Sequence, residues 1–473
     1  MRARTLLAPR RLAVAGLLAT AVVAACGDDA APDGSTAPAS SGAGAGGPGA
    51  GGAGAAAAGP GGAGAGAAGG GAEGPPAVAM SERTFVCKLI NGDSLEAPSD
   101  NHTHTRFNLR GTDLGVPLVT DDQLLLFFGD TTGYRVIWPF GEDPDSVARI
   151  PLAAAAADVA SLCSQLDFLV TADVPSVAAG VDPAVQRDFA GAFVTPPDGE
   201  AVGDYVHQPP TGFPNIPGTF EVPAGAAYQG GEALIFYASG AELSPRPRMT
   251  LSFVAGWADP GKSAPGYSIR YLLDRLVGGP LGGHFLQVAP AIDDDTTYLF
   301  GSGDYRHSGI WLARKPSAAL GTAGGEDVFD PSTGTWAQAS TLSQAEREAV
   351  APLLESDGVG ELSVFRVVIP GDGESAPDVV LWLMVYQREL HDAGGGIVDN
   401  RVVARVARAP EGPWSEPATI FDMADPAFQA AHCCGESCPG EQILHCDKAG
   451  LYGAYALPLI GRASCRERVF VGV

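Results

Sequence analysis

The chain has 473 residues, 45% of them hydrophobic, and a formal net charge of −25. A surface this acidic repels phosphate backbones and anionic lipid headgroups, so the charge excludes a nucleic-acid partner and any membrane contact except through an attached lipid. The sequence contains no nucleophile elbow and no HExxH helix, which leaves protease chemistry without residues to perform it.

The N-terminal segment 1–25 begins with several arginines and continues into an apolar stretch shorter than the about 20 residues that span a bilayer. The stretch ends in Val-Ala-Ala before Cys26, which resembles the bacterial lipobox. We therefore expect 1–25 to be a lipoprotein signal peptide and Cys26 to carry the lipid anchor. The protein would then be exported and held at a bacterial membrane, on its periplasmic or cell-surface side. An ordinary secretory signal ending near a cysteine is the alternative.

The next segment, 26–79, is a low-complexity tract of glycine, alanine, proline and serine. It cannot bury a core, so we expect a disordered tether with a root-mean-square span of roughly 40 Å. At the other end, the string IGRASCRERV in 460–473 resembles a translated sequencing adapter. We exclude 460–473 from the fold as an artefact, with a genuine basic C-terminus as the alternative.

The folded part is then 80–459. Helical periodicity is scarce there, and brief apolar runs that end at Gly, Asp or Pro recur. These runs are 124–130, 233–240, 297–304, 381–387 and 451–458. Five such units predict an all-β fold, a five-bladed β-propeller, with a two-sheet sandwich as the competitor. The Ala-rich segment 152–190 is expected to be a helical insertion.

The folded part contains six cysteines. Their even number and an exported location favour disulfides, with the pairing left open. The candidates are Cys87, Cys163, Cys433, Cys434, Cys438 and Cys446. The alternative is a zinc site in the Cys-rich segment 432–446, which also holds His432 and His445, but its spacing fits no common zinc pattern.

A set of short motifs adds a family resemblance. Gly-Thr-Asp-Leu-Gly at 111–115 and Phe-Phe-Gly-Asp-Thr at 127–131 are followed by Gly-Glu-Leu-Ser-Val at 360–364 and Ala-Pro-Glu-Gly-Pro-Trp-Ser at 409–415. In this order they resemble the family called domain of unknown function 4185, over 106–459. Characterised relatives form glycoside hydrolase family 183, endo-D-arabinanases with a five-bladed β-propeller. The insertion and the Cys-rich segment depart from the family pattern and leave the exact sugar open.

Glycosidic cleavage needs two carboxyl groups that flank the bond. Asp130 adjoins Gly129 in an apolar run, and Asp113 lies two residues from Gly111 and Gly115. The resemblance matches both aspartates to acidic active-site residues. The alternative is that each caps a turn, as Asp commonly does. Glu361 is the third catalytic candidate, expected to face the axis from another blade, and a solvated glutamate at a strand end is its alternative.

Two residues are candidates for substrate binding. Arg306 offers five donors suited to sugar hydroxyls or to holding a carboxylate ionised, with a salt bridge to Asp304 as the alternative. His207 lies in a proline-rich loop, where a plain surface histidine is the alternative. We expect no metal and no cofactor: His102 and His104 lack an acid cluster at fitting spacing, and 293–295 is expected to be a solvated acidic turn. Trp414 is expected to wedge between blades.

The sequence thus predicts a glycoside hydrolase that cleaves arabinofuranosidic linkages, endo-acting on D-arabinan, with a polysaccharide as its partner and a monomeric state. A non-catalytic carbohydrate-binding or adhesion propeller is the alternative. Whether the reaction retains or inverts configuration is left open.

Overall fold

The computed structural model describes residues 17–24, 76, 79–80, 84–90, 101–107, 109–133, 145–169, 194–195, 220–243, 246–261, 267–355, 358–369, 378–392, 396–433, 453–457 and 468–472. The chain divides into two compact units. All described elements belong to the first, Met1–Ala25 with Pro75–Val473, whereas the second, Cys26–Gly74, lies outside the described residues, as does most of the expected tether.

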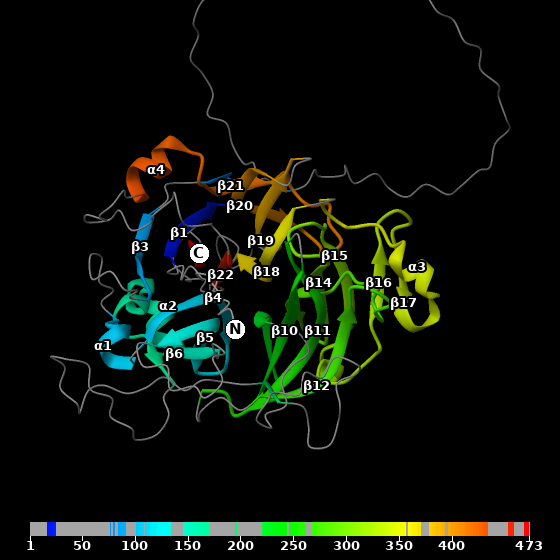
Figure 1. Cartoon of the computed structure of the whole chain (residues 1–473), viewed down its shortest axis with the longest axis horizontal. Coiled ribbons are helices and arrows are strands. Elements are labelled where there is room, and N and C mark those ends of the chain that lie inside the picture. The colour runs from blue at the N-terminus through cyan, green and yellow to red at the C-terminus, as the bar shows by residue number, and fades with distance from the viewer. Residues whose placement is uncertain are drawn as a thin grey trace, which may run out of the picture. The chain divides into compact units, whose positions relative to one another are not determined.

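Four antiparallel sheets follow one another along the chain as the blades of a β-propeller (Figure 1). In each blade the strands pair mainly in chain order, and one short strand, β8 (Val194–Thr195), adds to blade 2 parallel to β12. Blade 1 is β4 (Leu109–Val119), β5 (Gln123–Gly133), β6 (Ser146–Pro151) and β7 (Asp167–Phe168). Blade 2 is β9 (Phe220–Gln229), β10 (Glu232–Leu243), β11 (Arg246–Ala258) and β12 (Tyr267–Arg275). Blade 3 is β13 (Gln287–Asp293), β14 (Thr296–Ser302), β15 (Trp311–Pro316), β16 (Asp327–Asp330) and β17 (Thr335–Gln338). Blade 4 is β18 (Val359–Ile369), β19 (Val379–His391), β20 (Ile397–Ala407) and β21 (Ala418–Asp422).

The first strand of each blade lies innermost. Strands β4, β9, β13 and β18 contact one another in succession, and β22 (Tyr455–Leu457) contacts both β18 and β4. A ring of inner strands is therefore closed by a segment from near the end of the chain.

The expected number of five blades is wrong: the structure has four. The fifth sheet is not a consecutive meander, because it is assembled from both ends of the chain, with β22 as its one strand from the fifth apolar run. Its other strands are β1 (Leu17–Ala24), β2 (Ala79–Met80), β3 (Thr84–Lys88) and β23 (Arg468–Gly472). Leu18 of β1 pairs with Gly472 of β23, so strands lie in both the expected signal peptide and the expected artefact. The assignment of these two segments stays a prediction.

Tight turns join the inner strands to their neighbours. Gly230 and Gly231, at φ 60° and 86°, form the two-residue turn between β9 and β10, where L side chains would be strained. The acidic run 293–295 forms the equivalent turn between β13 and β14, as expected, with Asp294 at φ 51° and Asp293 in an ion pair with Arg366.

Helices are few and short among the described residues. The Ala-rich segment begins with α2 (Leu152–Ala157) and η1 (Val159–Cys163), whose N-cap Asp158 accepts a hydrogen bond from the Ala160 N–H. The helical prediction is confirmed for this part, and 170–190 lies outside the described residues. The remaining helices are α1 (Thr103–Phe107), η3 (Ser317–Ala319), η4 (Ala339–Thr341), α3 (Gln344–Glu348) and α4 (Pro426–His432).

The core consists of apolar layers between neighbouring blades. Blades 3 and 4 share one in which Trp414 meets Phe300 edge-on at 5.9 Å between ring centroids, and Trp382 packs beside them. Trp414 is 8% exposed, so the expected wedge between blades is confirmed. Full burial of one such aromatic side chain contributes about 1.5–3 kcal/mol, which makes these layers the main support of the ring.

Two of the candidate disulfide cysteines, Cys163 and Cys433, are disulfide-bonded, but their partners lie outside the residues whose side chains are described. The pairing stays a prediction, and so does the zinc alternative in 432–446. In the described part of the chain, no helix is long and apolar enough to cross a membrane.

Candidate functional site

Two of the predicted acids lie in one hairpin of blade 1. Asp113 of β4 pairs with Gly129 of β5, the residue before Asp130. Strand β6 pairs with the other edge of β5, and continuing its register by one residue sets Asp145 opposite Gly129 as well. Directly opposite residues share a face of a sheet, and Gly129 leaves the space between Asp113 and Asp145 open.

That face lies against blade 2. A Cβ at Gly129 would come within 3.0 Å of the Val222 Cγ1 atom on β9, so a larger residue would push the two blades apart. Val222 follows Glu221, whose charge acts on Asp145. Four acids from two blades therefore gather where the inner strands begin: Asp113, Asp130, Asp145 and Glu221.

The backbone is distorted on both sides of this row. From Gly111 to Asp113, β4 advances two residues while β5 advances three, and Asp130 in the extra step has φ 42°. Beyond Asp113 the excess lies on β4, where Leu114 has φ 65°. Such bulges re-aim side chains, and a bulky residue in the left-handed region costs about 1–3 kcal/mol, which the surrounding packing must offset.

A chain of buried hydroxyls ties the three strands together beside the acids. The Thr112 Oγ1 donates to the Gly129 carbonyl oxygen at 2.9 Å and lies 2.7 Å from the Thr131 Oγ1. The Thr131 Oγ1 lies 2.8 Å from the Ser146 Oγ. Each of these three residues adjoins one of the acids in sequence. The hydrogen-bonded hydroxyls therefore fix the positions of Asp113, Asp130 and Asp145 along their strands relative to one another.

Asp145 is the buried member of the group, at 6% exposure, whereas Asp113 and Asp130 are half-buried. Burial raises the pKa of the Asp145 carboxyl well above its usual value, and the charges of Glu221 and Asp130 add to this. The Tyr237 hydroxyl and the Asp130 backbone N–H act in the opposite direction. Burial therefore favours the neutral form of Asp145 over its charged form.

The third predicted acid, Glu361, lies on β18 and is 3% exposed. Its Oε1 accepts a hydrogen bond from the Tyr305 hydroxyl at 3.1 Å, and its Oε2 lies 3.5 Å from Arg306 Nη2. The other guanidinium nitrogen, Nη1, is 3.1 Å from Glu389 Oε2 on β19. The alternative of a solvated strand-end glutamate is wrong for Glu361, because it is buried and paired.

Arg306 thus bridges two buried carboxylates. Its own backbone has a φ of 56°, so it is a further residue in the left-handed region at this end of the ring. The alternative pairing with Asp304 is wrong, because Asp304 pairs instead with Arg248 of β11 at 3.1 Å. Burial raises the pKa of Tyr305 well above its usual value, so its hydroxyl remains a donor to Glu361.

Tyr305 also packs against a small cluster of blade 2 that includes Val222. The segment after β14 therefore crosses from the acids of blade 2 to those of blade 4. Gly453 lies between blade 4 and blade 1. Its N–H donates to Glu361 Oε2 at 3.3 Å, and a Cβ on Gly453 would lie 3.4 Å from the Leu114 Cα. The surroundings of Asp113 and Glu361 thus share one glycine, and the predicted acids lie around one mouth of the ring.

The axial cavity itself has a volume of about 370 Å³. Its walls are successive residues of β4, β9, β13, β18 and β22, and on β4 and β18 they begin past Asp113 and Glu361. The cavity is mostly apolar, with Ser363 and Arg366 among its few polar groups. The acids therefore lie toward one end of the channel and do not line it.

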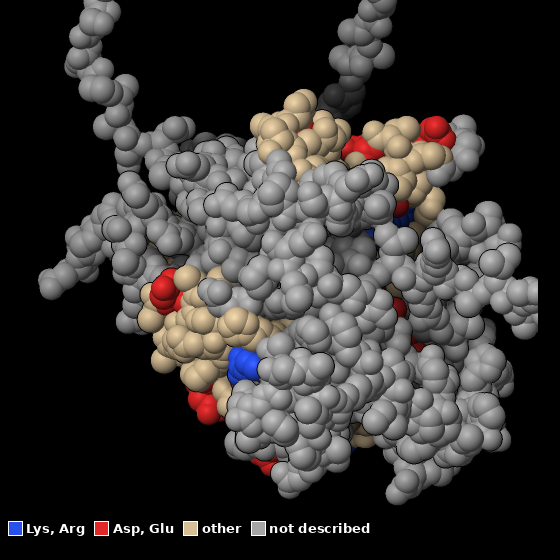
Figure 2. All heavy atoms as spheres, turned by 60° about the vertical axis from the view of Figure 1, so that its left-hand side comes forward, with Lys and Arg blue, Asp and Glu red and all other residues tan. Residues whose placement is uncertain are grey.

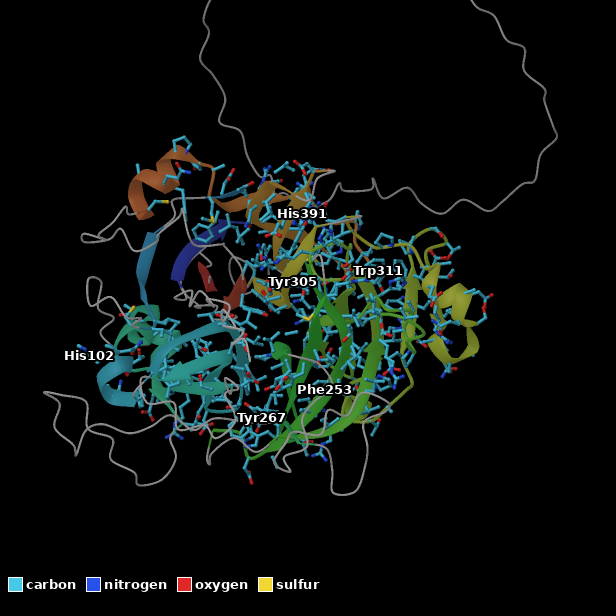
Figure 3. The ribbon with its side chains drawn as sticks, viewed as in Figure 1. His102, Phe253, Tyr267, Tyr305, Trp311 and His391 are labelled. Atoms are coloured by element: carbon cyan, nitrogen blue, oxygen red, sulfur yellow. The ribbon has the colours of Figure 1, made fainter. Side chains whose placement is uncertain are left out.

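The other predicted residues lie apart or outside. Figure 3 shows His102, the residue before α1, at the edge of the ribbon and away from Tyr305 and His391. His207 lies outside the described residues. Nowhere in the described ranges do three His, Cys, Asp or Glu side chains gather as metal ligands. Figure 2 shows acidic side chains at several separate places on one face and no large basic patch among the residues it colours.

Sequence reasoning missed Asp145, Glu221 and Glu389. Glu389 lies two residues past the fourth apolar run, and Asp130 and Asp304 end the first and third runs, so the repeat itself held this signal. His391 Nε2 lies 3.1 Å from Glu389 Oε1, and the His391 ring stacks on His307 at 4.5 Å between centroids.

No family model matches the chain. No curated protein matches it either. Solved structures similar to the chain include a candidate hydrolase from Bacteroides ovatus, at 14% identity and a TM-score of 0.44, covering 76% of this chain and 79% of that one. An α-L-arabinofuranosidase from Clostridium thermocellum has 9% identity, a TM-score of 0.35 and coverages of 67% and 74%. The arabinanase Arb43A of Bacillus subtilis has 11% identity, a TM-score of 0.34 and coverages of 67% and 84%. At these TM-scores the likeness carries no argument about activity.

Proposed function

We propose that the protein is a glycoside hydrolase that cleaves arabinofuranosidic linkages within D-arabinan, with Asp113 and Asp130 as its working carboxyl pair. The observation that carries the proposal is the gathering of acids from three blades around one mouth of the ring. Hydrolysis of a glycosidic bond needs one protonated and one ionised carboxyl group on either side of it. The choice of D-arabinan rests on the family resemblance of the motifs around Asp113 and Asp130.

The different degrees of burial of the acids support the choice of Asp113 and Asp130 as the working pair. Asp113 and Asp130 are half-buried and can meet a polysaccharide chain, whereas Asp145, Glu361 and Glu389 are buried. We propose that Glu361, fixed by Arg306 and Tyr305, shapes the field of the site from blade 4. A lipid at Cys26 and a flexible tether would let the domain reach substrate beyond the membrane.

A non-catalytic carbohydrate-binding propeller is the second candidate. It is favoured by the left-handed backbone at Asp130, since Asp is one of the residues best tolerated there for purely local reasons. In that case both aspartates would serve the backbone and not the sugar.

The two candidates differ in what happens to purified D-arabinan. The full chain is incubated with the polymer, and released oligosaccharides are measured for wild type, Asp113→Asn and Asp130→Asn. Asn preserves shape but removes the charge and the proton, so each variant should lose about 10²–10⁴-fold in turnover while melting within a few degrees of wild type.

Asp158→Asn is the matched control, because Asp158 caps η1 on the surface and Asn also caps well. Full turnover by both site variants would overturn the assignment. Retention of the polymer without any cleavage by wild type would favour the binding propeller.

A further inference from the structure

Asp145 is a buried ionisable group that the proposed reaction does not use. It immediately precedes β6 and is 6% exposed, too little for contact with a polysaccharide. Ionisable groups face it from four strands: Asp130 on β5, Glu221 on β9, Tyr237 on β10 and Tyr267 on β12. Burying a carboxyl group beside two other acids costs free energy. A role that an apolar side chain could not perform would explain why an acid occupies this position.

The bulge in β5 suggests that purpose. Where the register slips between Gly129 and Thr132, the regular ladder to β4 is broken, and Asp130 adopts its left-handed conformation. A buried backbone N–H in such a bulge needs an acceptor in place of the ladder. The register places Asp145 opposite Gly129, next to this bulge, and the Asp130 N–H is one of the groups that lower the pKa of its carboxyl.

We propose that Asp145 is a positioning residue, whose carboxyl oxygen accepts the Asp130 N–H and so holds the bulge that aims the Asp130 side chain at the substrate. The proposal rests on the proposed function, because it assigns the support of one of its two carboxylates. The Thr112–Thr131–Ser146 hydroxyl chain fixes the strands, and Asp145 fixes the one residue that departs from them.

The protonation of the Asp145 carboxyl is compatible with this role as a hydrogen-bond acceptor. Burial raises the pKa of the Asp145 carboxyl well above its usual value, which favours its neutral form beside Asp130. Burial likewise raises the pKa of Tyr237 and of Tyr267 well above their usual values, so both remain neutral phenols. A neutral acceptor can be replaced by the neutral amide of Asn, whereas an apolar side chain cannot replace it.

Two variants of the full chain test the proposal. Asp145→Asn keeps an acceptor oxygen, and we expect kcat within a few-fold of wild type. Asp145→Val removes the acceptor, and we expect kcat to fall about 100-fold with little change in KM, as for a misplaced reacting group. Hydrogen–deuterium exchange of the peptide spanning 127–133 should accelerate in Asp145→Val and remain slow in Asp145→Asn.

Asp274→Val is the matched control, because Asp274 is a buried acid of blade 2 that accepts the N–H groups of Arg275, Leu281 and Phe285. It should lower stability without accelerating exchange at 127–133. Equal losses of kcat in Asp145→Asn and Asp145→Val, or unchanged exchange in Asp145→Val, would overturn the proposal. If wild type fails to cleave D-arabinan, the proposed function fails, and the exchange measurement still decides whether Asp145 holds the bulge.

Discussion

Arg306 should carry a large part of the stability at the mouth of the ring. It is 15% exposed and lies between Glu361 and Glu389, whose side chains are 3% and 5% exposed. Replacing Arg306 by Met keeps its bulk but leaves two buried carboxylates without their shared cation. Breaking a buried ion pair in this way costs about 3–5 kcal/mol, because the two carboxylates stay buried without the cation that they shared.

The matched control is Arg248→Met, since Arg248 pairs with Asp304 near the same site but is 41% exposed. An exposed pair contributes about 0–1 kcal/mol. Urea unfolding followed by tryptophan fluorescence gives the free energy of unfolding for both variants. We expect the Arg306→Met deficit to exceed that of Arg248→Met severalfold at pH 7.

A double variant separates charge from packing. Arg306→Met combined with Glu389→Gln should recover part of the free energy of unfolding that Arg306→Met loses, because it removes one of the two buried charges. Deficits that agree within about 1 kcal/mol for Arg306→Met and Arg248→Met would refute the reasoning.

Three other predictions follow from single residues. Gly129→Ala should lower stability by about 1–3 kcal/mol in urea unfolding, since its Cβ would meet Val222 at 3.0 Å, and an unchanged midpoint would contradict the close approach of blades 1 and 2. Burial raises the pKa of Asp274 to about 6, above its unfolded value, so the folded state binds the proton more tightly and stability should fall as pH rises from about 4 to about 6. Asp274→Asn should flatten this part of the unfolding free energy against pH, and an identical slope in the variant would count against it. Cys26→Ser should move the protein out of the detergent-extracted membrane fraction, and unchanged membrane association would remove the lipoprotein assignment.

The blade pattern could be predicted because the second strand of each blade is buried on both faces. In β5 and β10 the residues 124–129 and 233–240 are all buried, so they read as unbroken apolar runs. The run in β19 is buried throughout, and the part of the third run within β14 is buried except at Tyr298, so these two runs completed the repeat. The fifth run misled, because it reads like the others yet becomes only the three-residue β22, with partners from the chain ends.

The candidate site could be predicted only in part, for a related reason. Asp113 and Asp130 stand out because glycines flank them at the bulges. Asp145 and Glu221 carry no such local signal: their neighbourhood exists only once blade 2 packs on blade 1. Arg306 was expected to pair with Asp304, its near neighbour in sequence, but it pairs with Glu361 and Glu389 of blade 4. Such a contact between blades cannot be read from nearness in sequence.

The closure of the ring by β22 sets the order in which the site can mature. Gly453 supplies an N–H to Glu361, and the Ala456 N–H donates to Ser363, so blade 4 receives these contacts from the final stretch of the chain. During synthesis the N-terminal blades emerge first and can fold as they appear. The ring is closed only after β22 has been synthesised. Until then a nascent chain holds its acids on separate blades, and the assembled site forms last.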